Sequence, residues 1–150
     1  MASREKRILV VEDDDAIRAL LFAVLRRRGF KVDTSPNGAD GLQRLRSCAY
    51  SLVLLDLMMP VMTGYEFLGQ LERQDPPSRP LVIVLSAGGS TRNLNPQTVA
   101  GTIRKPFDIE LLVDTVSACL STQDGVAQSD NCPAADSDGP EPSGAGKEPN

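Results

Sequence analysis

Short, unbroken apolar runs recur along the first two thirds of the chain, each bounded by charged or turn-forming residues. The clearest runs are residues 8–11, 52–55 and 81–85, whose length and Val, Ile and Leu content are typical of strands buried on both faces. Residues 30–34 and 99–104 also have the length and β-branched content of strands. The pattern therefore predicts five short strands.

The segments between these strands have the spacing of amphipathic helices. In the first segment, apolar residues recur at intervals of three and four and so share one face: Ile17, Leu20, Leu21, Val24 and Leu25. Acidic residues precede this helix, three arginines end it, and Gly29 is placed to close it. Shorter helices are predicted around residues 39–45 and over 65–73, and Asp108 is expected to cap a last helix.

Apolar strands that alternate with helices are typical of a parallel sheet covered on both faces. Five such units predict a doubly wound α/β domain with a five-stranded parallel sheet in the flavodoxin-like order 2-1-3-4-5. The segment from Ser86 to Thr98, SAGGSTRNLNPQT, has three Gly or Pro residues and only Leu94 as a large apolar residue. The fourth crossover helix is therefore expected to be short or absent.

Composition divides the chain into two parts. Its 150 residues and 16.1 kDa are enough for one ordinary domain, which we expect over residues 1–121. Beyond Leu120 there is no Leu, Ile, Phe, Tyr or Met, and Pro, Gly, Ser, Ala and acidic residues dominate. Such a segment buries too little apolar surface to offset chain entropy, so residues 122–150 are expected to form a disordered acidic tail.

Charge separates the same two parts. The formal net charge of the chain is −4, but six acidic residues against one lysine give residues 121–150 a net charge of −5 and leave +1 for the rest. A nearly neutral body gives no support for nucleic-acid binding. The segment MASREKRILVV has no signal-peptide pattern and no apolar run is long enough to span a bilayer, so a cytoplasmic protein without a membrane partner is expected.

Polar side chains stand where the predicted strands end. Glu12 and Asp13 follow the first strand, Asp56 the third, Ser86 the fourth and Lys105 the fifth. The carboxyl ends of parallel strands meet at one edge of a sheet, and the first and third strands are neighbours in the predicted order. Three carboxylates should therefore converge there, with a hydroxyl and an ammonium opposite.

Three carboxylates at such close range repel one another unless a hard divalent cation lies among them. The chain has no histidine and its three cysteines form no CxxC pair, which argues against zinc. Oxygen ligands alone suit Mg²⁺, which keeps several waters and leaves room for phosphate oxygens. Asp56 would then be a nucleophile that accepts a phosphoryl group, with Mg²⁺ and Lys105 neutralising the developing charge.

Each of these residues also has a purely structural interpretation. Glu12 and Asp13, like Asp14 and Asp15, can be acidic charges that favour a helix N-terminus. Ser86 can be a turn former after a strand. A single strand-end carboxylate would ordinarily be assigned such a role, but the whole cluster at one sheet edge favours a functional site.

Four segments resemble the receiver domain of two-component response regulators: ILVVEDDDAIRALL, LVLLDLMMPVMTGYEFL, VIVLSA and RKPF. They agree with that family in type, order and position relative to the predicted strands, and the resemblance covers roughly residues 6–120. It implies a single-domain, stand-alone receiver that takes phosphate from a histidine kinase or a histidine phosphotransfer protein in a phosphorelay. Such a receiver would act through contacts with a downstream protein, without a DNA-binding output domain and without being an enzyme.

The resemblance also assigns roles to residues. Asp56 is implied as the phospho-acceptor, Ser86 as the switch hydroxyl that meets the phosphoryl group, and Lys105 as the family's lysine. Pro106 would follow that lysine through a cis peptide bond. The implied magnesium ligands are carboxylates and one backbone carbonyl, from Glu12, Asp13, Asp56 and Met58.

Two features depart from the family pattern. Thr102 stands three positions before the lysine, where family members usually carry an aromatic residue that turns inward on activation. The interval from Ser86 to Lys105 is also shorter than usual, in the segment where a helix is weakly supported. We therefore expect an output surface that differs from the family standard.

Two other functions compete with a phosphorylated receiver. A phosphorylation-independent, pseudo-receiver type of protein-binding module would explain both departures. A hydrolase that uses Asp56 in turnover usually needs a second carboxylate two residues on, and that position is Met58. The hydrolase is therefore the weaker alternative.

Overall fold

The computed structural model describes residues 6–73, 80–87 and 94–121, and within them one parallel sheet has the strand order β2-β1-β3-β4-β5. The strands are β1 (Arg7–Val11), β2 (Lys31–Ser35), β3 (Leu52–Asp56), β4 (Leu81–Ser86) and β5 (Val99–Arg104). The predicted five-stranded sheet and its 2-1-3-4-5 order are confirmed.

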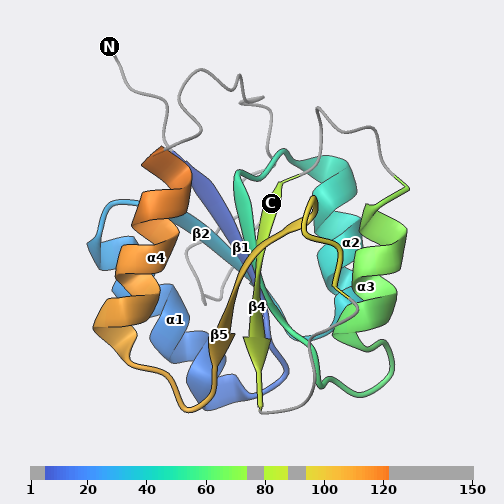
Figure 1. Cartoon of the computed structure of the whole chain (residues 1–150), viewed down its shortest axis with the longest axis horizontal. Coiled ribbons are helices and arrows are strands. Elements are labelled where there is room, and N and C mark those ends of the chain that lie inside the picture. The colour runs from blue at the N-terminus through green and yellow to red at the C-terminus, as the bar shows by residue number, and fades with distance from the viewer. Residues whose placement is uncertain (1–5, 74–79, 88–93, 122–150) are drawn as a thin grey trace, which may run out of the picture.

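Helices cover both faces of this sheet (Figure 1). Those in the described residues are α1 (Asp15–Arg27), α2 (Gly38–Ser47), α3 (Gly64–Leu71) and α4 (Ile109–Ser121). Residues of α1 and α4 pack into one apolar core, whereas residues of α2 and α3 pack into the other. This is the doubly wound arrangement that the alternating pattern predicts.

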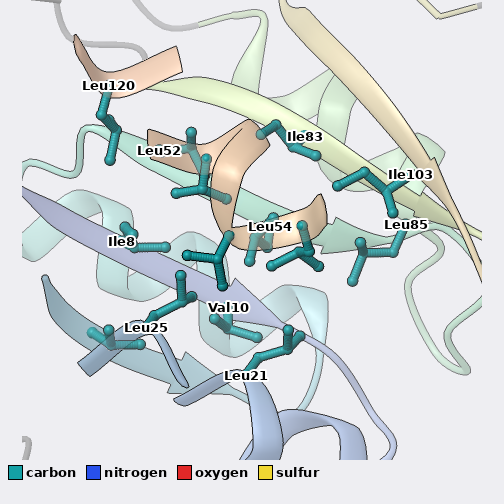
Figure 2. Close-up of a cluster of buried hydrophobic side chains, with 14 residues drawn as sticks. Ile8, Val10, Leu21, Leu25, Leu52, Leu54, Ile83, Leu85, Ile103 and Leu120 are labelled. Carbon is teal, nitrogen blue, oxygen red and sulfur yellow. The ribbon is translucent and has the colours of Figure 1, made fainter. Parts of the chain in front are cut away.

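The interior strands β1, β3 and β4 are apolar except at their ends, because they supply both cores. Ile8 and Val10 of β1 face α1 and α4, whereas Leu9 and Val11 face α2 and α3, and all four side chains are fully buried. Figure 2 shows the first of these cores, in which side chains of β1, β3 and β4 meet those of α1. Successive strand side chains point to opposite faces, so no polar position interrupts these strands.

Short polar signals set the ends of the helices. The Asp14 carboxylate caps α1 by accepting a hydrogen bond from the Ile17 N–H at 3.0 Å. Gly29 follows α1 with a φ of 95°, and its N–H donates to the Arg26 carbonyl at 3.0 Å. Asp108 caps α4 by accepting from the N–H groups two and three residues further on. The predicted cap at Asp108 and the predicted helix end at Gly29 are therefore confirmed, and Asp14 is a cap that the sequence analysis treated only as a helix N-terminal charge.

The connection from β4 to β5 contains a turn and no helix in its described part, which is Ala87 and residues 94–98. Residues 88–93 lie outside the described residues. β5, the strand that follows this connection, has three exposed residues: Ala100, Thr102 and Arg104. The expectation of a short or absent fourth crossover helix agrees with this exposed strand face.

The tail expected over residues 122–150 lies outside the described residues. Among the residues that are described, no helix has both the length and the apolar content needed to cross a membrane.

Candidate phosphoryl-acceptor site

The site lies at the edge of the sheet where the strands end. β1 runs directly into Glu12 and Asp13, while β3 ends in Asp56 itself. The two strands are hydrogen-bonded neighbours, and Val11 is paired in register with Leu55. The fold therefore brings acidic residues that are more than forty positions apart in the sequence to adjacent strand ends.

Three carboxylates meet at this edge. Glu12, Asp13 and Asp56 each offer an oxygen that lies within 4.8 Å of the other two. Glu12 and Asp56 are 0 % and 2 % exposed, and Asp13 is the most exposed of the three. Because like charges at this range repel, and burial removes the water that would screen them, the cluster requires a compensating cation.

Lys105 supplies part of that compensation. Its Nζ lies 3.0 Å from Oε1 of Glu12 and 3.4 Å from Oδ2 of Asp56. It follows β5 directly, and its backbone N–H donates to the Ser86 carbonyl at 2.7 Å. The peptide bond from Lys105 to Pro106 is cis, the isomer that the resemblance implies.

The environment of Glu12 favours its neutral form more than is usual for a glutamate. Burial raises the pKa of Glu12 to about 7, while hydrogen bonds from the Asp14 N–H and from Lys105 oppose that rise. Arg18 stabilises the backbone at Glu12, since its guanidinium donates a hydrogen bond to the Glu12 carbonyl at 2.9 Å. Burial works against the Lys105 ammonium too, but its contacts with Glu12 and Asp56 raise the pKa of Lys105.

The loop after β3 holds the Asp56 carboxylate in place. The Met58 N–H donates to Oδ1 of Asp56 at 3.1 Å, and the Gly64 N–H donates to the Leu57 carbonyl at 3.0 Å. A side chain at Gly64 would not fit, because its Cβ would lie 2.6 Å from Leu57 Cα and 2.8 Å from the Asp56 carbonyl oxygen. Val61 has a φ of 72° in this loop, a conformation that β-branched residues rarely adopt.

The donor set fits a hard divalent cation. Among the residues that the structure describes, the three carboxylates share this volume with the ammonium of Lys105 alone, so a further positive charge is needed to balance them. All three ligands are oxygens, which Mg²⁺ prefers, and Mg²⁺ also tolerates an incomplete set of protein ligands. The residues present therefore suit Mg²⁺ better than zinc or another metal that prefers nitrogen or sulfur.

The structure brings carboxylate oxygens of Glu12, Asp13 and Asp56 within 4.8 Å of one another. Lys105 lies within 3.4 Å of two of these residues, Glu12 and Asp56. Ser86 ends β4, is 5 % exposed, and joins the site through its carbonyl bond to Lys105. Met58 contacts Asp56 through its N–H, and the residue is 68 % exposed.

Three contributors were not singled out by the sequence analysis: Gly64, Arg18 and Val61. The glycine has a detectable signal, because a Thr-Gly pair at the start of a helix is typical of a cap followed by a close backbone approach. Arg18 acts through a backbone carbonyl, which no side-chain pattern reveals. The left-handed backbone of Val61 runs against its residue type, so nothing in the sequence points to it.

A doubly wound parallel sheet with three carboxylates and a lysine at its strand ends is typical of a signalling receiver domain, and comparisons with known proteins identify the same class. The family model described as the response regulator receiver domain matches residues 8–117. The chain therefore belongs to the response regulator receiver family of two-component signalling systems.

Among curated relatives, the uncharacterized transcriptional regulatory protein YkoG of Bacillus subtilis is 38 % identical over 120 residues, which cover 75 % of this chain and 50 % of YkoG. The response regulator ArlR of Staphylococcus aureus is 34 % identical over 124 residues, covering 78 % of this chain and 53 % of ArlR. The chain thus spans about half the length of the curated relatives it matches.

Solved structures have the same fold. The response regulator TrrA of Thermotoga maritima, crystallised in complex with Mg²⁺ and BeF, is 32 % identical with a TM-score of 0.68, covering 76 % of this chain and 98 % of TrrA. A CheY-like receiver domain protein of Methanospirillum hungatei is 26 % identical with a TM-score of 0.73, covering 80 % of this chain and 97 % of its own.

Proposed function

We propose that the chain is a phospho-accepting receiver in which Asp56 takes a phosphoryl group from a phosphohistidine of a histidine kinase or histidine phosphotransfer protein. The observation that carries this proposal is the buried Asp56 carboxylate at the end of β3, which contacts Lys105 and lies beside two further carboxylates. A carboxylate that served only the fold would have no reason to be gathered with others at this edge.

The reaction follows from the position of Asp56. One carboxylate oxygen attacks the phosphorus of the phosphohistidine, so an O–P bond forms while the P–N bond breaks and the imidazole nitrogen keeps the bonding electron pair. The Lys105 ammonium lies within 3.4 Å of the Asp56 carboxylate and would stabilise negative charge on the incoming phosphoryl oxygens. The Met58 N–H orients the carboxylate by its bond to Oδ1.

Glu12, Asp13, Asp56 and the Met58 backbone carbonyl would hold Mg²⁺ beside the acceptor. When bound, Mg²⁺ supplies charge neutralisation for the transferred group. Two facts support this assignment: the three carboxylates lie within 4.8 Å of one another, and the related TrrA was crystallised with Mg²⁺.

Ser86 would act as the switch hydroxyl, because it ends the strand next to Asp56 and its carbonyl is bonded to Lys105. The signal would pass to another protein through a surface that differs from the family standard. Thr102 supports this difference, since it is exposed on β5 where the family pattern has an aromatic residue. We assign the chain a role in signalling and no catalytic turnover of its own.

Incubation with acetyl phosphate and Mg²⁺ followed by intact-protein mass spectrometry tests the proposal. We expect wild type to gain the mass of one phosphoryl group, and both Asp56→Asn and an EDTA-treated sample to gain none. Asp114→Asn is the matched control, because Asp114 is an exposed aspartate of α4 that pairs with Arg28 and should leave the gain unchanged. Circular dichroism of each variant checks that it is folded.

A phosphorylation-independent binding module is the second candidate. The exposed Thr102 and the helix-free described part of the β4–β5 connection favour it, because both lie on the route from phosphate to output. Absence of a mass gain in folded wild type, or an equal gain in Asp56→Asn, would favour this candidate over the receiver.

A further inference from the structure

Charge is segregated between the two edges of the sheet. Acidic residues gather where the strands end, whereas basic residues gather where the strands begin and α1 ends. We call this second group the basic edge and define it as Lys6, Arg26, Arg27, Arg28 and Lys31. Helices that connect parallel strands run against them, so helix C-termini, which favour basic residues, lie at the edge where the strands start.

The basic edge is a compact surface. The Lys31 N–H donates to the Lys6 carbonyl at 3.0 Å, so the two lysines stand on adjacent backbone segments. Lys31 follows Arg28 by three positions and Arg27 by four, across the turn at Gly29. Both Arg27 and Lys31 are exposed, so the like charges of this edge face solvent together.

Two arginines of this edge have contacts within the described residues. Arg28 forms an ion pair with Asp114 of α4 at 3.5 Å, with side chains 47 % and 71 % exposed. Arg26 stacks over the Phe22 ring at 5.4 Å from its centroid. Exposed ion pairs of this kind contribute little to stability, and both arginines remain accessible to solvent.

The chain leaves the domain close to this edge. α4 ends at Ser121, seven residues beyond Asp114, which at 1.5 Å per helical residue is about 10 Å. Figure 1 shows α4 running against β5, so its end points to the side where the strands begin. Asp124 follows three residues later, within about 10 Å of extended chain.

We propose that the acidic segment 122–150 docks on the basic edge of the same chain. This segment has six acidic residues and one lysine, so its charge is complementary to that edge. The tether at Ser121 makes the contact intramolecular, and short tethers give effective concentrations of about the millimolar range, so weak ion pairs are enough. The contact lies away from Asp56 and does not depend on phosphorylation.

Two-dimensional amide NMR of the full chain at low ionic strength tests the contact. A tail variant carries Asn in place of four aspartates, at Asp124, Asp130, Asp136 and Asp138. We expect its amide signals for the basic edge to be displaced from those of wild type. The displacement should vanish as salt is raised from about 0.01 M to 1 M, because the screening length falls from about 30 Å to about 3 Å.

The reciprocal variant, Arg27→Gln with Lys31→Gln, should displace signals of residues 122–150. Arg104→Gln is the matched control, because Arg104 is an exposed cation on the opposite edge and should leave those signals in place. Tail signals that coincide in wild type and in the Arg27→Gln, Lys31→Gln variant would overturn the proposal. Displacements that grow with protein concentration would overturn it too, because the tail would then contact a second copy.

Discussion

The Nζ atom of Lys105 lies 3.0 Å from Oε1 of Glu12, although 93 positions separate the two residues in the chain. Glu12 is fully buried and Lys105 is 18 % exposed, so this contact is a partly desolvated ion pair at the centre of the site. It joins the end of β1 to the end of β5, strands that are not neighbours in the sheet. Changes to either residue should therefore alter both the stability and the chemistry of the site.

Replacing Lys105 by Met removes the cation and keeps most of the side-chain volume. At pH 8 we expect the free energy of unfolding to fall by about 3 kcal/mol, because buried carboxylates lose their partner. At pH 6 the loss should be smaller, since Glu12 then binds a proton. Urea unfolding at both pH values measures the difference, with Arg104→Met as the exposed control. Equal losses at the two pH values would show that Lys105 does not compensate a titrating carboxylate.

The raised pKa of Glu12 predicts a stability profile of definite sign in metal-free buffer. A carboxyl whose pKa rises on folding from 4.5 to about 7 binds more protons in the folded state between these values. Its contribution is fully present below pH 4.5 and is lost as the pH rises through 7. Relative to Glu12→Gln, wild type should lose roughly 3 kcal/mol over this interval.

Urea unfolding in EDTA across pH 4.5 to 8 measures this profile. Glu110→Gln is the matched control, because Glu110 is an exposed glutamate in the first turn of α4 and its replacement leaves Glu12 in place. The control should keep the wild-type slope. Parallel profiles for wild type and Glu12→Gln would contradict the assignment of the slope to Glu12.

Two glycines of α3 should respond in opposite directions to alanine. Gly64→Ala places a Cβ 2.6 Å from the Leu57 backbone, so we expect a loss of about 2 kcal/mol in unfolding free energy and displacement of Asp56. Gly69 has open space around it, so Gly69→Ala should gain about 0.5–1 kcal/mol from helix propensity. Thermal and urea unfolding of both variants make the comparison. A neutral Gly64→Ala would mean that the backbone at Asp56 is not closely packed.

Asp13 should contribute more to metal affinity than to folding. We expect Asp13→Asn to weaken Mg²⁺ binding by at least about tenfold, since losing even an outer partner of a metal ligand costs about 10–100-fold. Isothermal titration calorimetry gives the affinity, and Asp15→Asn controls for the loss of one nearby negative charge. Equal affinities for the two variants would remove Asp13 from the ligand set.

The strands were predictable because burial on both faces leaves an unmistakable pattern. The run over residues 52–55 has no polar position, and the observed β3 extends it by the single residue Asp56. A helix start was predictable where a side chain acts on the backbone next to it, as at Asp108. The β4–β5 connection has few apolar residues, and its described part shows no helix.

The sequence predicted which residues form the site better than it predicted which of them contact one another. Strand ends place Glu12, Asp56 and Lys105 at one edge, but the sequence does not tell which carboxylate the ammonium contacts more closely. The position of the Asp56 carboxylate also depends on the loop after β3, in which Gly64 lies close to the Leu57 backbone and Val61 has a left-handed conformation. Such features arise from tertiary packing, which local patterns do not encode.

The most direct test of the central claim is to locate the phosphoryl group. Wild type is treated with acetyl phosphate and Mg²⁺, and its fragments are sequenced by mass spectrometry at low temperature. The account predicts one phosphoryl group, carried by Asp56 and removed by hydroxylamine as an acyl phosphate should be. A phosphoryl group on any other residue, or one that resists hydroxylamine, would contradict the account.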